Sequence, residues 1–218
     1  MDRWLYLCKS NFRVIDEAQK STNHQQIIIN QEKKMARTES NEFAVGKKAP
    51  DFTLVNTVDD KKYTLNDLKG SKGTVIMFIC NHCPFVIHVN SALVQLANDY
   101  QQRGIAFIAI SANDIENYPQ DAPHLMKKVA VDNQYPFPYL YDETQEVAKA
   151  YDAACTPDFY VFDADLKSIY HGQLDDSRPG NEKPVTGKDM RVALDNLLEN
   201  KPALENQKPS VGCGIKWK

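Results

Sequence analysis

The chain lacks any long hydrophobic run. Its longest apolar stretches, such as Ile105–Ile110, have the length of a single β-strand, whereas a membrane-spanning helix needs about 20 apolar residues. Trp4–Cys8 is too short for the hydrophobic region of a secretory signal and lacks a cationic start. We therefore expect a cytoplasmic protein with no membrane partner.

An excess of charge of one sign is also missing. The formal net charge is only −3, so the composition offers no basic surface for nucleic acid, and no nucleic-acid partner is expected. No Gly-rich phosphate-binding loop stands out, which gives no reason to expect an organic cofactor. The sequence contains no internal repeat, and its length suits one globular α/β domain.

Cysteine is sparse and irregularly spaced, which argues against the disulfide framework of a small secreted protein. The five cysteines are Cys8, Cys80, Cys83, Cys155 and Cys213. Two of them stand three residues apart in Cys80-Asn81-His82-Cys83-Pro84. This stretch follows an apolar run, 74–79, and opens an amphipathic segment that reaches residue 100. Two cysteines at a strand-to-helix junction indicate a redox-active thiol site, because unpaired helix N-terminal amides favour a thiolate.

Pro84 indicates which of the two cysteines begins the helix. Proline is tolerated at the first helical position, where its missing N–H costs nothing. With Cys83 as N-cap, Pro84 takes that position, whereas with Cys80 as N-cap it would remove a helical hydrogen bond. We therefore predict that Cys83 caps the helix and is the nucleophile. The predicted buried stripe of this helix is Val86, Val89, Leu93, Leu96, Ala97 and Tyr100.

The remaining elements follow from apolar patterning and turn signals. Predicted strands are 52–55, 61–64, 105–111, 138–141, 159–163 and 167–172, and predicted helices are a short one capped by Thr64, then 122–133, 143–151 and 189–200. The alternation of strands and helices is typical of a layered α/β fold.

Several of these pieces resemble a known family. The stretch 73–101 resembles the active-site strand and helix of thioredoxin, with His82 in place of the tryptophan before the first cysteine and Val86 in place of the second cysteine. More widely, residues 43–218 resemble peroxiredoxin-like proteins of the AhpC/TSA type, through 46–54, Cys83-Pro84, 156–163 and 175–180. A subgroup of these proteins shares the Cys-Asn-His-Cys-Pro motif and a Gly-Cys-x-Ile-Lys-Trp tail.

The resemblance implies a thioredoxin-like three-layer α/β/α sandwich with a mixed central sheet. We expect residues 43–200 to form this domain and residues 201–218 to form a C-terminal tail that folds back on it. Residues 1–42 lack periodicity and are expected to be a disordered extension. An alternative interpretation is that the segment before Met35 is not native, because codons for 31–34 can spell a ribosome-binding site just before Met35, where we expect the true start.

The candidate catalytic residues are Cys83, Cys80, Cys155 and His82. His82 as imidazolium would stabilise the Cys83 thiolate. The resemblance implies that Thr156 and Pro157 contact the substrate, that the Thr156–Pro157 peptide is cis, and that Cys155 then lies near the other two cysteines.

These residues favour a thiol-disulfide oxidoreductase that acts on a protein disulfide or a peroxide and is restored by a thiol reductant. Cys80 or Cys155 would resolve the mixed disulfide or sulfenate that forms on Cys83. One alternative is a thiol-dependent peroxidase with antioxidant activity. Such a peroxidase would use Cys83, whereas in true peroxiredoxins the peroxide-reacting cysteine matches Val86 of this chain. Another alternative is a metal-binding protein with Cys80, Cys83 and Cys155 as ligands. The oligomeric state does not follow from the sequence.

The C-terminal tail shows a strand-like period of two. Val211, Cys213, Ile215 and Trp217 alternate with glycine or lysine. We predict that the tail docks on the domain, buries Trp217 and turns Cys213 inward, where it is a possible resolving thiol for Cys83.

Overall fold

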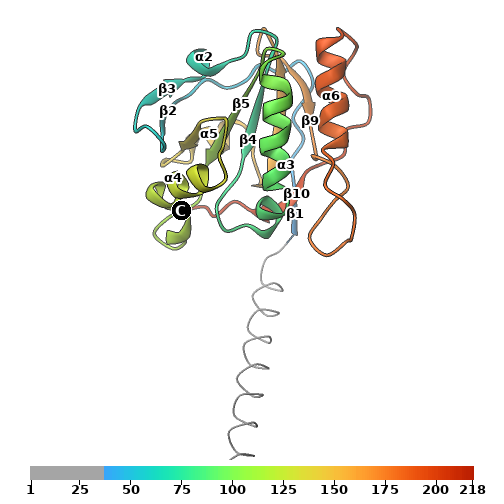
Figure 1. Cartoon of the computed structure of the whole chain (residues 1–218). Helices are drawn as coiled ribbons and strands as arrows, with labels where there is room; N and C mark the ends of the chain where they lie inside the picture. Colours follow the sequence, from blue (N-terminus) through green and yellow to red (C-terminus); the bar gives the residue numbers. More distant parts are fainter. Residues whose placement is uncertain (1–36) are drawn as a thin grey trace, which may run out of the picture. The chain divides into compact units, whose positions relative to one another are not determined.

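The computed structural model describes residues 37–218. Strand β4 (Gly73–Phe78) lies inside the main sheet, between two neighbouring strands (Figure 1). All of β4 is buried, as its largely apolar sequence predicts for a strand that is covered on both faces. It pairs in parallel with β5 (Ile105–Ser111) and antiparallel with β8 (Asp158–Asp163). The loop that follows β4, with its two cysteines, therefore starts at the centre of the sheet.

The main sheet is mixed. Its seven strands follow the order β3 (Lys62–Thr64), β2 (Thr53–Asn56), β6 (Tyr139–Tyr141), β5, β4, β8 and β9 (Ser168–His171). The pairs β4–β5 and β5–β6 are parallel, and the other neighbours are antiparallel.

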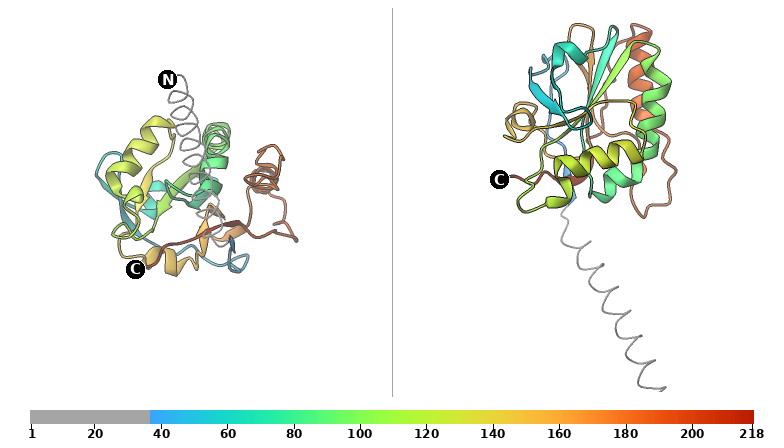
Figure 2. Two further views of the ribbon diagram at one scale, coloured as in Figure 1. Left: turned by 90° about the horizontal axis from the view of Figure 1, so that it is seen from below. Right: turned by 60° about the vertical axis from the view of Figure 1, so that its left-hand side comes forward.

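Helices cover both faces of this sheet. One face carries α3 (Pro84–Gln101), α4 (Pro123–Asp132) and α6 (Lys188–Leu198), and the other carries α5 (Glu146–Ala150) (Figure 2). The arrangement is a thioredoxin-like three-layer α/β/α sandwich, which confirms the predicted fold class. No helix within residues 37–218 is long and apolar enough to cross a membrane.

Side chains of the central strands point alternately to the two faces of the main sheet, so the core has one part on each face. Ile76 and Phe78 face an aromatic cluster with Tyr151, Tyr160 and Phe162, in which Phe78 and Tyr160 meet edge to face at 5.8 Å. On the other face, α3 buries its apolar stripe. The buried residues of α3 are Val86, Val89, Leu93, Leu96, Ala97 and Tyr100, which confirms the predicted stripe.

Local signals set several helix boundaries. Thr64 caps the short helix α2 (Leu65–Leu68) in a capping box with Asp67, as predicted for Thr64. Helix α5 begins later than predicted, because its N-cap Gln145 adopts a left-handed conformation with φ of 64°. The backbone cannot continue as a helix through that residue, so 143–145 form the turn before α5.

A second, three-stranded sheet lies beside the N-terminus of α3. Its strands are β1 (Arg37–Glu39), β10 (Val211–Gly214) and β7 (Cys155–Thr156), with β10 in the middle and antiparallel to both. The expected N-terminal extension, 1–42, is thus too long, because residues 37–39 are a strand of the folded domain. The rest of that expectation, including the start at Met35, concerns residues outside the described part of the chain.

The end of the tail differs from its prediction in one side chain. Cys213 and Ile215 are buried, but Trp217 is 43% exposed, so the prediction of a buried Trp217 is wrong. The regular strand ends at Gly214, and the period of two does not continue beyond Ile215. The backbone after it is held instead by hydrogen bonds from the Asp114 amide to the Lys216 carbonyl and from the Lys218 amide to Gln145 Oε1.

Candidate thiol redox site

Cys83 is the N-cap of α3, with Pro84 at the first helical position, as predicted. Cys83 is fully buried, and Cys213 is only 2% exposed. The Cys83 Sγ lies 2.9 Å from the Cys213 Sγ and 3.1 Å from the Thr156 carbonyl oxygen. Neither cysteine forms a disulfide. The structure therefore brings together two thiols that are 130 residues apart in the sequence.

The surroundings of Cys83 favour its thiolate. Hydrogen bonding with Cys213, and next with Cys80, lowers the pKa of Cys83, and the Val86 amide in the first helical turn adds to this. The same bonds with Cys83, followed by burial, raise the pKa of Cys213 and of Cys80. The three thiols together therefore favour ionisation of Cys83 before that of Cys80 or Cys213.

Asp121 holds the loop between the two motif cysteines. This fully buried carboxylate belongs to the short 3₁₀ helix η1 (Pro119–Asp121). Its Oδ1 accepts the Asn81 amide at 2.8 Å, and its Oδ2 accepts Asn113 Nδ2 at 2.8 Å. Nothing in the sequence marks Asp121, because it stands in a polar turn far from the motif.

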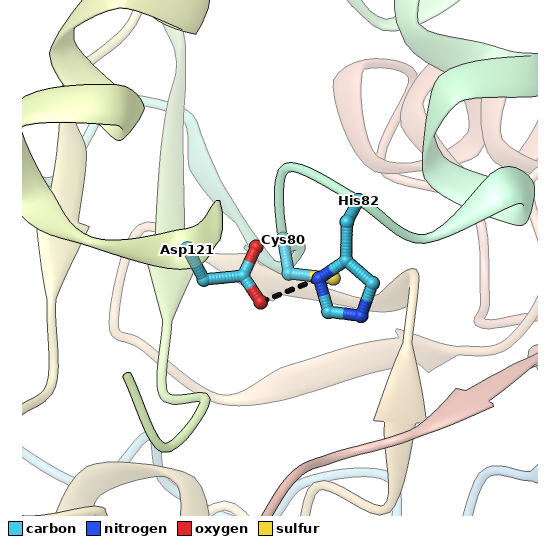
Figure 3. A group of neighbouring side chains, drawn as sticks. All are labelled: Cys80, His82 and Asp121. Carbon is cyan, nitrogen blue, oxygen red and sulfur yellow. Dashed lines mark ion pairs between the residues drawn. The ribbon is translucent and has the colours of Figure 1, made fainter. Parts of the chain in front are cut away.

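His82 is turned toward Cys80 and Asp121 (Figure 3). Its Nδ1 lies 2.7 Å from Asp121 Oδ2, but the two groups are not aligned for a hydrogen bond. The ring stacks on Tyr118 with centroids 5.7 Å apart. The Cys80 Sγ, in turn, lies 3.4 Å from Thr156 Oγ1.

Thr156 and Pro157 lie beside the thiols, and their peptide bond is cis, as the resemblance implied. Cys155 is also buried nearby, but its thiol is directed at the Pro157 carbonyl oxygen at 3.7 Å. Burial, followed by the negative charge of Asp158, raises the pKa of Cys155. Of the predicted residues, the structure therefore joins Cys83 with Cys213 and Cys80, and leaves Cys155 as a protonated, inward-facing thiol.

Gly212 allows the tail to approach this site. A Cβ at that position would lie 1.9 Å from the Thr156 carbonyl oxygen, a distance that no side chain tolerates. The register of β10 on β7 places Cys213 opposite Thr156. Glycine before Cys213 is thus a requirement of the close packing that places the two sulfurs in contact.

A thioredoxin-like sandwich with a helix-capping thiol beside a second thiol defines a thiol redox protein in general terms. The chain belongs to the AhpC/TSA family, whose model matches residues 45–171.

Three solved structures show how far this similarity extends. A conserved protein from Geobacillus kaustophilus is 64% identical, with a TM-score of 0.83 over 84% of this chain and 97% of the other. A protein from Sinorhizobium meliloti 1021 is 44% identical, with a TM-score of 0.81 over 83% and 98%. A peroxidoxin from Mycobacterium tuberculosis shares the fold at 17% identity, with a TM-score of 0.53 over 72% and 97%. No curated protein sequence matches the chain.

Proposed function

We propose that this protein is a thiol-disulfide oxidoreductase in which Cys83 is the nucleophile and Cys213 the resolving thiol. The observation that carries the proposal is the 2.9 Å contact between their sulfurs at the N-terminus of α3. A thiolate is the species that attacks a disulfide, and the lowered pKa of Cys83 supports its presence at neutral pH.

The reaction consists of two exchanges. The Cys83 thiolate attacks one sulfur of a substrate disulfide, forms a mixed disulfide, and releases the other substrate sulfur as a thiolate that takes up a proton. Cys213 then loses its proton and attacks the Cys83 sulfur. A Cys83–Cys213 disulfide forms and the second substrate thiol leaves, so the substrate gains two electrons and the protein loses two. An external thiol reductant reverses the oxidation.

Cys80 is the other candidate for the resolving role. It stands three residues before Cys83 and shares a hydrogen bond with it. We favour Cys213, because its sulfur lies in direct contact with the Cys83 sulfur, at 2.9 Å. Cys155 is the weakest candidate, since burial raises its pKa and its thiol is turned to a backbone carbonyl.

The same site is less suited to a dedicated peroxidase. Val86, which matches the peroxide-reacting cysteine of true peroxiredoxins, is a buried residue of α3 and carries no thiol. Peroxide oxidation of Cys83 to a sulfenic acid, followed by condensation with Cys213, would use the same pair. The rate of peroxide consumption with a thiol donor, compared with the rate of disulfide reduction, shows which of the two substrates the site prefers.

Single cysteine variants of the full chain test the proposal. Glutathione disulfide is the substrate, dithiothreitol is the reductant, and adducts are identified by mass spectrometry after acid quenching. We expect Cys83→Ser to abolish turnover, and Cys213→Ser to accumulate a glutathione adduct on Cys83. Cys155→Ser is the matched control and should behave as the wild type. Full turnover by Cys83→Ser would overturn the nucleophile assignment, and adduct accumulation only in Cys80→Ser would transfer the resolving role to Cys80.

A further inference from the structure

Three side chains with metal-binding atoms meet beside the cysteine loop. The Cys80 Sγ, the His82 Nδ1 and a carboxylate oxygen of Asp121 all lie within 4.8 Å of one another, and the three point toward a common centre (Figure 3). Cys80 and His82 follow β4, whereas Asp121 comes from η1, so the fold gathers them from separate segments. The disulfide exchange proposed above gives no role to His82 or Asp121.

The Nδ1 atom of His82 faces the Asp121 carboxylate without forming an aligned hydrogen bond. This atom is buried and makes no aligned hydrogen bond within the described structure, although Asp121 Oδ2 is 2.7 Å away. A buried polar atom without an aligned partner is costly and calls for a ligand or a role. In the neutral ring tautomer that carries its proton on Nε2, the Nδ1 lone pair can bind a cation.

Asp121 has acceptor capacity left. An ionised carboxylate offers about four acceptor positions, and the Asn81 amide and the Asn113 side chain occupy two of them. These two donors also fix the carboxylate in place. Metal-binding carboxylates are commonly oriented by such outer hydrogen bonds.

The other two donors are likewise positioned by neighbours. His82 stacks on Tyr118 at 5.7 Å, which fixes the plane of the ring. The Cys80 Sγ has Thr156 Oγ1 at 3.4 Å, a hydroxyl that can donate a hydrogen bond to a thiolate ligand.

The dimensions of the cluster suit a tetrahedral ion. With metal bonds of about 2.0–2.3 Å, donor atoms in such a site lie about 3.4–3.6 Å apart. The observed separations, from 2.7 Å up to 4.8 Å, bracket this value, so side-chain adjustments of about 1 Å would suffice. A thiolate, an imidazole and a carboxylate together favour zinc among the biological divalent ions.

We propose that Cys80, His82 and Asp121 form a binding site for Zn²⁺ or a similar borderline-soft divalent cation, with the fourth position open to water. This ligand set differs from the Cys80, Cys83 and Cys155 set that the sequence suggested. It also stands independently of the proposed exchange reaction. A bound ion would withhold Cys80 from disulfide formation and leave Cys83 and Cys213 able to pair.

Cobalt titration of the full-length reduced protein tests the site, because Co²⁺ reports its ligands spectroscopically. We expect one Co²⁺ per chain, a sulfur-to-cobalt charge-transfer band, and the intense visible bands of four-coordinate cobalt, all removed by Zn²⁺. Cys80→Ser should lose the charge-transfer band. His82→Gln and Asp121→Asn should each weaken binding by at least about tenfold.

The chain offers a matched control for each of the three ligands. Cys155→Ser, His88→Gln and Asp114→Asn change the same residue types outside the cluster and should leave the titration unchanged. Circular dichroism checks the fold of each variant, and His82→Gln, on a loop residue with a 19% exposed ring, carries the test if Asp121→Asn is unstable. The proposal is overturned if the wild type binds no Co²⁺, if Cys155→Ser removes binding, or if the folded His82→Gln variant binds as tightly as the wild type.

Discussion

Gly212→Ala should separate the two sulfurs without touching either cysteine. The added methyl would lie 1.9 Å from the Thr156 carbonyl oxygen, and real Cβ atoms stay at least 3.0 Å from such an atom. The tail must therefore retreat by roughly 1.1 Å, since the obstacle is backbone. The Sγ–Sγ distance would then rise from 2.9 Å to about 4 Å. A displacement of about 1 Å can lower the rate of a positioned reaction by about 100-fold.

The measurement is the rate at which Cys213 attacks a mixed disulfide on Cys83. The full-length protein is mixed with oxidised glutathione, quenched in acid at successive times, and mapped by mass spectrometry for glutathione adducts and for the Cys83–Cys213 disulfide. We expect Gly212→Ala to lower the rate at which the adduct is converted to the disulfide by about 100-fold relative to wild type. Overpacking at this position should also lower the free energy of unfolding by about 1–3 kcal/mol.

Gly214→Ala is the matched control. A Cβ at Gly214 has its nearest contact at 3.1 Å, with the Oγ1 of Thr38, and the closest backbone atom is 4.0 Å away. Since both changes remove a glycine from the same strand, their effects on the unfolded chain cancel in the comparison. We expect Gly214→Ala to remain close to the wild type. The reasoning is refuted if Gly212→Ala pairs Cys83 with Cys213 as efficiently as Gly214→Ala does.

Three further predictions concern the thiol and the packing of the domain. Because the pKa of Cys83 is lowered, its alkylation rate should stay nearly constant from about pH 8 to about pH 6; peptide-resolved labelling with iodoacetamide measures it, and a tenfold fall per pH unit would contradict it. Ile215→Ala, at a 6% exposed core position, should cost about 2–5 kcal/mol in urea unfolding, and Trp217→Ala, at a 43% exposed position, less than about 0.5 kcal/mol; equal costs would show that the tail docks differently. Leu93→Ala on the buried face of α3 should cost about 2–5 kcal/mol, whereas Ile87→Ala, 61% exposed on the same helix, should change the unfolding midpoint little.

The sequence was sufficient for the elements whose signals are local. Pro84 located the start of α3, because proline fits one position of a helix and disrupts the others. The stripe from Val86 to Tyr100 followed from the period of an α-helix, and the apolar run before Cys80 gave the central strand. Each of these inferences needs only residues within a few turns of one another.

Features that depend on backbone pairing or on distant partners could not be predicted in the same way. Strand β1, Arg-Thr-Glu, is largely exposed and is held by hydrogen bonds to β10, so it has no apolar period to detect. Asp121 is linked to Asn81 across 40 residues, and nothing in its own neighbourhood marks it. The tail pattern indicated an inward Cys213, but its alternation could not show that the regular strand stops at Gly214 and leaves Trp217 exposed.

The burial of Cys83 makes the strand β10 a part of the site that the proposed exchange must move. The strand is joined to β7 by two residue pairs and to β1 by three, and its Cys213 lies against Cys83. Because Cys83 is fully buried, the proposed exchange requires β10 to leave β7 before a disulfide reaches the Cys83 sulfur, and the same movement would carry Cys213 away. A mixed disulfide on Cys83 would then last until β10 pairs with β7 again, so the time that the tail spends undocked would set the lifetime of the proposed intermediate.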